Sequence, residues 1–209
     1  MPRRKRPRNE QQRSAIADEA ARMMQEHGLS DYRSAKAKAG MRLGLEDRGA
    51  LPSNREVESA LAERHRVFHG AEHAHLIDEL RAAALEMMNR ISEFDPRLTG
   101  PVLAGTATVH GTIDLHVFSD APEALGSALD ALGVPNRPVQ HRLRRRRDDS
   151  TLFPGYRFMS GGHEFCALVF PERGRGNAPL SAVDGRPMRR ATPRDVAALL
   201  AARNAPSAS

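Results

Sequence analysis

Polar and apolar side chains alternate in the segment from residue 112 to residue 118. Thr112, Asp114 and His116 occupy every second position, and aliphatic residues lie between them. A period of two predicts a β-strand with one apolar and one polar face. We expect the apolar face to pack on helices. The polar face, with the carboxyl group of Asp114 and the imidazole of His116, would then line a cleft.

Two glycines precede this strand. Gly100 and Gly105 flank a short predicted strand at Val102–Leu103, and Thr106 directly follows the second glycine. Glycine allows the backbone to approach a ligand closely, and N–H groups in a turn can bind an anion. The pattern indicates a phosphate-binding turn beside Asp114.

These motifs resemble the signature of the nucleotidyltransferase, or DNA polymerase beta-like, superfamily. The match lies in Gly105-Thr106-Ala107-Thr108 and Ile113-Asp114-Leu115, within residues 97–120. Residues 31–36 and 179–191 also resemble a group of proteobacterial proteins of unassigned function that share this domain. The resemblance implies transfer of a nucleotidyl group from a nucleoside triphosphate to an acceptor, with Mg²⁺ as the cofactor.

The resemblance also implies roles for individual carboxylates. Asp114 would be a catalytic residue and a metal ligand, because Mg²⁺ prefers oxygen ligands and bridges phosphate oxygens. A further carboxylate is expected on a neighbouring strand, with the same two roles. Glu164 is the candidate, although Cys166 matches that position about equally well.

The triphosphate would lie against the backbone of the glycine turn. The resemblance places it at Gly100, Gly105 and Thr106. His116 could contact a phosphate from the same strand face, or it could be a half-buried histidine that is paired within the protein.

Two positions depart from the family pattern. Pro101 replaces the serine of the turn, which removes a hydroxyl and an N–H donor, and Thr112 replaces the first of two aspartates. Two functions therefore stay open. The chain could be an active nucleotidyltransferase, or a catalytically degenerate copy that binds nucleotide or RNA.

Positive charge is concentrated in two clusters. The chain has 32 basic and 26 acidic residues, with a net charge of +6. Residues 3–8 hold one cluster, and outside both clusters acidic residues outnumber basic ones. Such clusters bind polyanions such as RNA through phosphate contacts; the alternative is a solvated loop. The second cluster consists of Arg142, Arg144, Arg145, Arg146 and Arg147.

Other classes of site have weaker support. His65, His69 and His73 could bind Zn²⁺ or Ni²⁺ on one helix face, or could be exposed polar side chains. The single cysteine, Cys166, excludes an internal disulfide, and no apolar run approaches the length of a membrane helix. We expect a cytoplasmic bacterial protein without a membrane partner.

Capping signals locate several helix ends. Ser before a helix with Glu three residues later forms a capping box, and glycine commonly follows a helix. A Ser-Gly-Gly run predicts a hairpin turn at residues 160–162, and Asp184-Gly185 predicts another turn. The predicted helix starts are Ser30, Ser53 with Glu56, and Thr192 with Asp195, and the predicted ends are Gly28, Gly44 and Gly133.

The sequence predicts an α+β fold in four regions. These are a basic disordered tail (1–9), a helical region (10–95), a small mixed β-sheet core of the nucleotidyltransferase type with flanking helices (96–175), and a C-terminal extension with one helix (176–209). Whether residues 54–93 form one helix or two is open. Predicted helices cover residues 10–27, 31–43, 54–93, 121–132 and 192–202, and predicted strands cover Val102–Leu103 and residues 113–118, 152–159 and 165–170.

Overall fold

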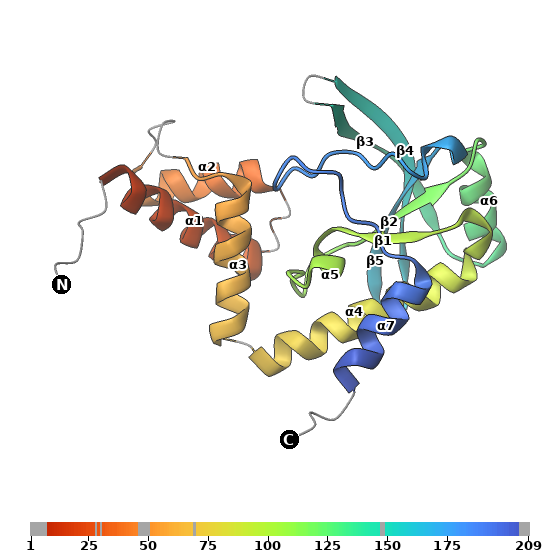
Figure 1. Cartoon of the computed structure of the whole chain (residues 1–209), viewed down its shortest axis with the longest axis horizontal. Helices are drawn as coiled ribbons and strands as arrows, with labels where there is room; N and C mark the ends of the chain where they lie inside the picture. Colours follow the sequence, from red (N-terminus) through yellow and green to blue (C-terminus); the bar gives the residue numbers. More distant parts are fainter. Residues whose placement is uncertain are drawn as a thin grey trace. The chain divides into compact units, whose positions relative to one another are not determined.

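The computed structural model describes residues 8–27, 29, 31–45, 51–68, 70–146 and 149–204. N-terminal helices are followed by a five-stranded mixed sheet, so the α+β class is confirmed (Figure 1). The chain forms two compact units. The first contains the chain up to His73 with residues 108–110 and 182–184, and the second contains the remainder. This division falls inside the region predicted to be helical rather than at residue 96.

The first unit is built from three helices around a small apolar core. They are α1 (Arg8–His27), α2 (Tyr32–Leu43) and α3 (Asn54–Phe68). Arg8 and Asn9 thus belong to a helix, and the rest of the predicted tail lies outside the described residues. The core side chains recur at helical spacing, which is why these segments fold as helices. They are Ile16, Ala17, Ala20, Met23, Met24, Ala35, Ala39 and Val57.

Local capping signals are confirmed in this unit. Ser53 and Glu56 exchange the hydrogen bonds of a capping box, with Glu56 N–H donating to Ser53 Oγ at 3.2 Å and Ser53 N–H donating to Glu56 Oε2 at 2.7 Å. Gly44 ends α2 with φ 65°. The side chain that caps the start of α2 is Asp31. The predicted caps Ser30 and Gly28 lie outside the described residues.

Residues 54–90 form two helices rather than one. The second helix is α4 (Gly70–Arg90), and His69 between the two lies outside the described residues. His65 is only 4% exposed, and its ring stacks on that of His73 with the centroids 3.6 Å apart. The interpretation of His65 as an exposed polar side chain is therefore wrong.

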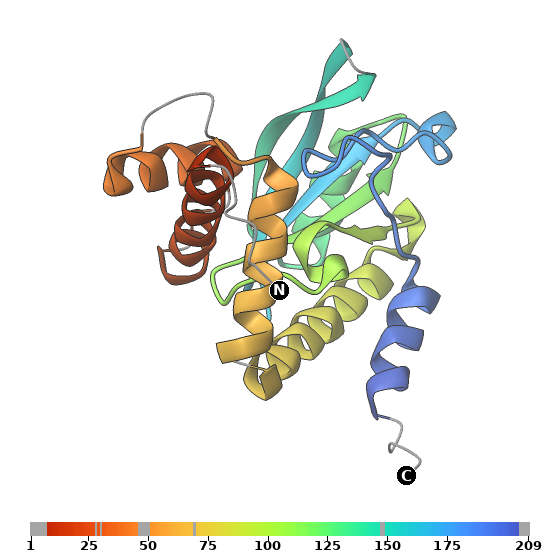
Figure 2. The same ribbon diagram turned by 60° about the vertical axis from the view of Figure 1, so that its left-hand side comes forward.

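The second unit holds the sheet, with strand order β1-β2-β5-β4-β3 (Figures 1 and 2). β2 and β5 are parallel, and the other neighbours are antiparallel. Three predicted strands and the Ser160-Gly161-Gly162 hairpin turn are confirmed. The strands are β1 (Arg97–Thr99), β2 (Ile113–Phe118), β3 (Asn136–Arg146), β4 (Asp149–Ser160) and β5 (His163–Phe170).

One prediction about this region is wrong, and one alternative that the sequence left open does not hold. Val102 and Leu103 lie in a short helix, α5 (Gly100–Ala104), and not in a strand. Gly100 leaves the strand conformation with φ 69°, and Pro101 has the fixed φ that suits the first turn of a helix. The described members of the arginine cluster, Arg142 to Arg146, belong to β3 and not to a loop.

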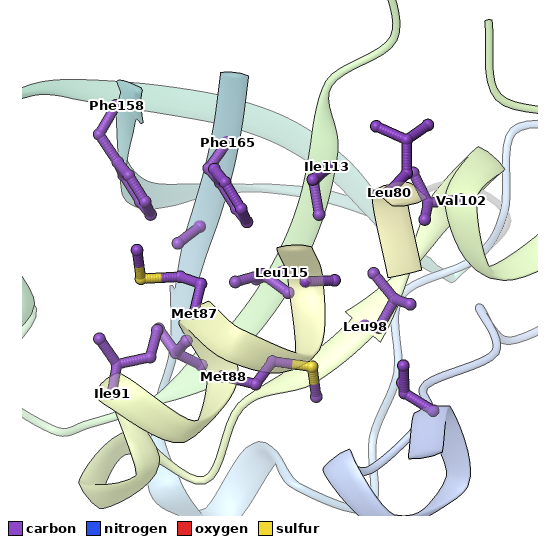
Figure 3. Close-up of a cluster of buried hydrophobic side chains, with 14 of the residues drawn as sticks. Leu80, Met87, Met88, Ile91, Leu98, Val102, Ile113, Leu115, Phe158 and Phe165 are labelled. Atoms are coloured by element: carbon purple, nitrogen blue, oxygen red, sulfur yellow. The ribbon is translucent and has the colours of Figure 1, made fainter. Parts of the chain in front are cut away.

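The apolar face of the sheet packs against α4, α6 (Glu123–Ala131) and α7 (Pro193–Asn204). Ile113 and Leu115 of β2 point into this core, together with Met87 and Met88 of α4 (Figure 3). The alternation that predicted β2 is thus confirmed on its apolar side. The predicted start of α7 is also confirmed, since Asp195 N–H donates to Thr192 Oγ1 at 3.1 Å.

Among the described residues, the structure has no helix that is both long enough and apolar enough to cross a membrane.

Candidate functional site

Polar side chains form a row across the face of the sheet opposite the core. One residue from each strand lies in register with its neighbours. Because residues paired in a sheet project to the same side, the five side chains share one face. We call this set the polar row, and it consists of Thr99, Asp114, Cys166, Arg157 and Arg137.

Asp114 is the half-buried carboxyl group of the polar row. Burial raises its pKa from 3.8 to about 7, and the positive charge of Arg157 offsets part of that effect. A perturbed carboxyl group next to a specific charge is typical of functional sites, although ion-pair networks show it too. Gly100 lies directly against Asp114, because a Cβ at Gly100 would fall 2.6 Å from Asp114 Oδ2.

The other residues expected to bind phosphate are already engaged with the backbone. Gly105 N–H and Thr106 N–H both donate to the carbonyl oxygen of Pro101, at 2.8 and 2.9 Å. Arg81 fixes the same turn by donating to the carbonyls of Val102 and Leu103. The structure therefore brings Gly100 to Asp114, whereas Gly105 and Thr106 lie at the far end of α5, where they close the helix.

The two candidates for the further carboxylate occupy different places. Cys166, and not Glu164, pairs with Asp114 in the parallel register of β2 and β5. Glu164 lies two residues earlier, where it accepts hydrogen bonds from Thr112 Oγ1 at 3.2 Å and from Arg157 Nη1 at 3.3 Å. The carboxylate of Glu164 is thus committed to a cation and a hydroxyl.

Cys166 is a buried thiol beside a histidine. Its Sγ lies 3.9 Å from His141 Nε2, and burial raises its pKa to about 12. A thiol with so high a pKa holds its proton at neutral pH, whereas nucleophilic attack needs the thiolate. Cys166 is therefore a packing residue of the polar row.

The donor groups do not fit a pair of Mg²⁺ ions. Mg²⁺ requires hard oxygen ligands in octahedral geometry, but a thiol stands beside Asp114, and Arg157 holds Glu164. In the part of the chain that the structure describes, no group of three or more His, Cys, Asp and Glu side chains is arranged to hold a metal ion. Mg²⁺ stays a prediction from the resemblance.

His116 is paired within the protein. It is 2% exposed, and Arg190 Nε donates to its Nδ1 at 2.9 Å. Burial and the charge of Arg190 lower the pKa of His116 to about 3, so the ring is neutral. The guanidinium of Arg190 also lies over the rings of Phe118 and Phe170, with its central carbon 5.1 and 4.7 Å from their centroids. Arg190 therefore anchors the C-terminal segment to the sheet.

A small cavity lies on this side of the sheet. It has a volume of about 90 Å³ and is lined by side chains that include Asp114, His116, His141 and Cys166. Ligand pockets for drug-sized molecules span roughly 300–1,000 Å³, so this cavity cannot enclose a nucleotide. On this side of the sheet, a nucleotide would have to bind at the surface.

The strands β3 and β4 continue beyond the rest of the sheet as a two-stranded ribbon (Figure 2). Only residues 155–160 of β4 pair with β5, so residues 140–146 and 149–154 pair with each other beyond the edge of β5. A β-bulge between Arg144 and Arg146 interrupts the pairing, and Leu180 N–H donates to the carbonyl of Arg144 at 2.7 Å. We call this segment the arginine ribbon.

The arginines of the ribbon face solvent. Arg142, Arg144, Arg145 and Arg146 are all exposed, whereas Arg147 lies outside the described residues. Arg142 donates to Ser150 Oγ at 3.4 Å, and no described carboxylate pairs with any of the four. Four unneutralised cations on one projecting element form a strong local positive charge.

Comparisons with protein-family models, with curated proteins and with solved structures gave no match to this chain.

Proposed function

We propose that this chain binds single-stranded RNA through the arginine ribbon. The observation that carries the proposal is the set of four exposed arginines on a projecting β-ribbon, without carboxylate partners among the described residues. Lys and Arg side chains supply most of the affinity of proteins for phosphate backbones. The ribbon carries little negative charge that would repel RNA, because Asp149 is the one described carboxylate on it.

The spacing of the arginines suits an extended polyanion. Alternate residues of a strand lie roughly 6.8 Å apart on one face, which is close to the separation of successive phosphates in an extended single strand. Arg142 and Arg144 have this spacing. The bulge after Arg144 interrupts the alternation, so Arg145 and Arg146 do not continue this spacing. Such a ribbon binds phosphates without reading the base sequence.

The state of the carboxyl groups on the sheet also favours a binding function over catalysis. The charge of Glu164 is engaged by Arg157, and Asp114 has a raised pKa. The proposal therefore treats the chain as a catalytically degenerate copy of the fold that its sequence resembles.

The test is RNA affinity in a variant that carries R142Q, R144Q and R146Q. We expect its affinity for a single-stranded RNA 20-mer to fall at least about tenfold at low salt, because three phosphate contacts are lost. Fluorescence anisotropy measures the dissociation constant. The matched control, R33Q with R55Q and R66Q, removes the same charge from exposed positions of the first unit. Equal losses in both variants would contradict the proposal.

A second candidate function is nucleotidyl transfer, favoured by the contact between Gly100 and Asp114. For this function T112D should supply the missing metal ligand. The added charge should lower the melting temperature of the metal-free protein by repulsion from Asp114 and Glu164, and millimolar Mg²⁺ should restore it. Thermal melts of wild type and T112D with and without Mg²⁺ decide this. A destabilised variant without a magnesium response would remove the second candidate.

A further inference from the structure

Two arginines and one carboxylate form a charged group at the end of the polar row, separate from the arginine ribbon. Arg137 and Arg157 are paired residues on β3 and β4, and Glu164 projects from β5 on the same face. Arg157 Nη1 donates to Glu164 Oε1 at 3.3 Å, and Arg137 Nη2 lies 4.0 Å from the same oxygen. One carboxylate thus serves two guanidinium groups, which leaves the group with a surplus positive charge.

Arg157 has donor capacity that the protein does not use. Its Nε is buried and has no hydrogen-bond partner. A buried donor without a partner is costly, and a guanidinium offers five N–H donors in a planar fork that matches phosphate oxygens. The charge of Arg157 also affects the pKa of Asp114 and His141, which places the guanidinium on the polar side of the sheet.

The group is open to small ligands. The side chain of Arg137 is 70% exposed and that of Glu164 is 36% exposed. An anion that displaces the Glu164 carboxylate would take its place at Arg137, and the side chain of Arg157 is 30% exposed next to the same position. The hydroxyl of Thr112, which now donates to Glu164, lies beside the same space.

We propose that Arg137 and Arg157 form a subsite for a phosphoryl anion, and that Glu164 is the internal counter-anion which the ligand displaces. The ligand class is pyrophosphate, either free or as the terminal phosphates of a nucleotide. This subsite does not depend on RNA binding by the arginine ribbon. The two roles of Glu164 predict opposite results. If Glu164 is a counter-anion, loss of its charge strengthens ligand binding, whereas loss of a metal ligand would weaken it.

The test is calorimetric titration of the full chain with inorganic pyrophosphate in metal-free buffer that contains EDTA. E164Q should bind about tenfold more tightly than wild type, and R137Q about tenfold more weakly, because a charge close to the ligand is removed in each case. Arg137 lies exposed on the edge strand, so R137Q does not endanger the fold. E63Q is the matched control, since it removes a carboxylate from the exposed pair Arg66–Glu63 and should change nothing.

A second titration with ATP distinguishes the two sources of the ligand. Affinity for ATP equal to that for pyrophosphate assigns the subsite to a nucleotide, and affinity for pyrophosphate alone assigns it to the free anion. Unchanged or weaker pyrophosphate binding by E164Q overturns the proposal, as does absence of binding by both proteins. The pyrophosphate titration is then repeated with Mg²⁺ in place of EDTA. A loss of binding by E164Q under that condition alone would make Glu164 a metal ligand and also overturn the proposal.

Discussion

Replacing Gly155 with alanine should lower the free energy of unfolding of the second unit by about 3 kcal/mol, because the new methyl group has no space. A Cβ at Gly155 would fall 2.4 Å from the carbonyl oxygen of Ala167 and 3.0 Å from the Cα of Leu168. Both are backbone atoms of β5, the strand that pairs with β4 at this point. Backbone atoms cannot move aside as the end of a flexible side chain can, so strands β4 and β5 would have to separate locally.

Urea unfolding followed by circular dichroism measures this loss. The matched control is Gly176→Ala, because a Cβ at Gly176 would meet no atom within 4 Å. The control should remain within about 0.5 kcal/mol of wild type, as surface substitutions usually do. A Gly155→Ala protein as stable as the control would show that β4 and β5 do not approach each other as described.

Asp114→Asn should make the protein more stable at alkaline pH and should change the pH dependence of its stability. The native state holds the proton of Asp114 up to a pKa of about 7, whereas the unfolded chain releases it near 3.8. Between these values the unfolded state binds fewer protons, so the stability of the wild type falls as pH rises. The full loss above pH 7 is roughly 4 kcal/mol, which the asparagine variant avoids.

The titration of His116, on the same strand, changes the stability of the protein with pH in the opposite direction. Its native pKa is about 3, whereas the unfolded chain takes up the proton near 6.5. Over that range stability rises with pH, since the unfolded state binds more protons. The contributions of Asp114 and His116 therefore nearly cancel between about pH 4 and 6.5. The Asn variant should expose the rise that is due to His116.

The measurement is urea unfolding of wild type and Asp114→Asn at pH 4.5 to 8.5. We expect the stability difference between them to grow by about 1.4 kcal/mol per pH unit up to pH 7 and then level off. Glu93→Gln, which neutralises an exposed carboxylate, is the control and should give a nearly constant difference. A variant that is less stable than wild type at pH 8 would contradict the burial of a charged Asp114.

Features that depend on neighbouring residues were predictable from the sequence. The strand that carries Asp114 follows from alternation over seven residues, and the capping pairs Ser53–Glu56 and Thr192–Asp195 span only three. In each case the physical cause lies within the segment itself. Local patterns therefore predicted β2, β5 and the starts of α3 and α7.

Features that depend on distant contacts were not predictable. Val102 and Leu103 form too short an apolar run for its periodicity to distinguish helix from strand. The strand β3 escaped detection because its apolar alternation is short and is interrupted by arginines. Its aliphatic members Val139 and Leu143 are only partly buried, against the cluster that contains Phe153 and Phe170. Arg190 lies 74 residues from His116, and no local signal connects them.

In the candidate site, too, only the features set by local sequence were predictable. The sequence placed Asp114 on the polar face of a strand, and the structure confirms that position. The register of β2 and β5 decides that Cys166, rather than Glu164, is the neighbour of Asp114. Register is set by the packing of the whole sheet, and a single segment does not contain that information.

The most direct test of RNA binding by the arginine ribbon is the salt dependence of the affinity. The measurement is the slope of log K against log salt for a single-stranded RNA 20-mer, for wild type and for the variant with R142Q, R144Q and R146Q. The slope should become less negative by about 2 in the variant, because each lost phosphate contact contributes about −0.7. The control with R33Q, R55Q and R66Q should keep the wild-type slope. Equal slopes in the ribbon variant and the wild type would show that these arginines do not contact the RNA backbone.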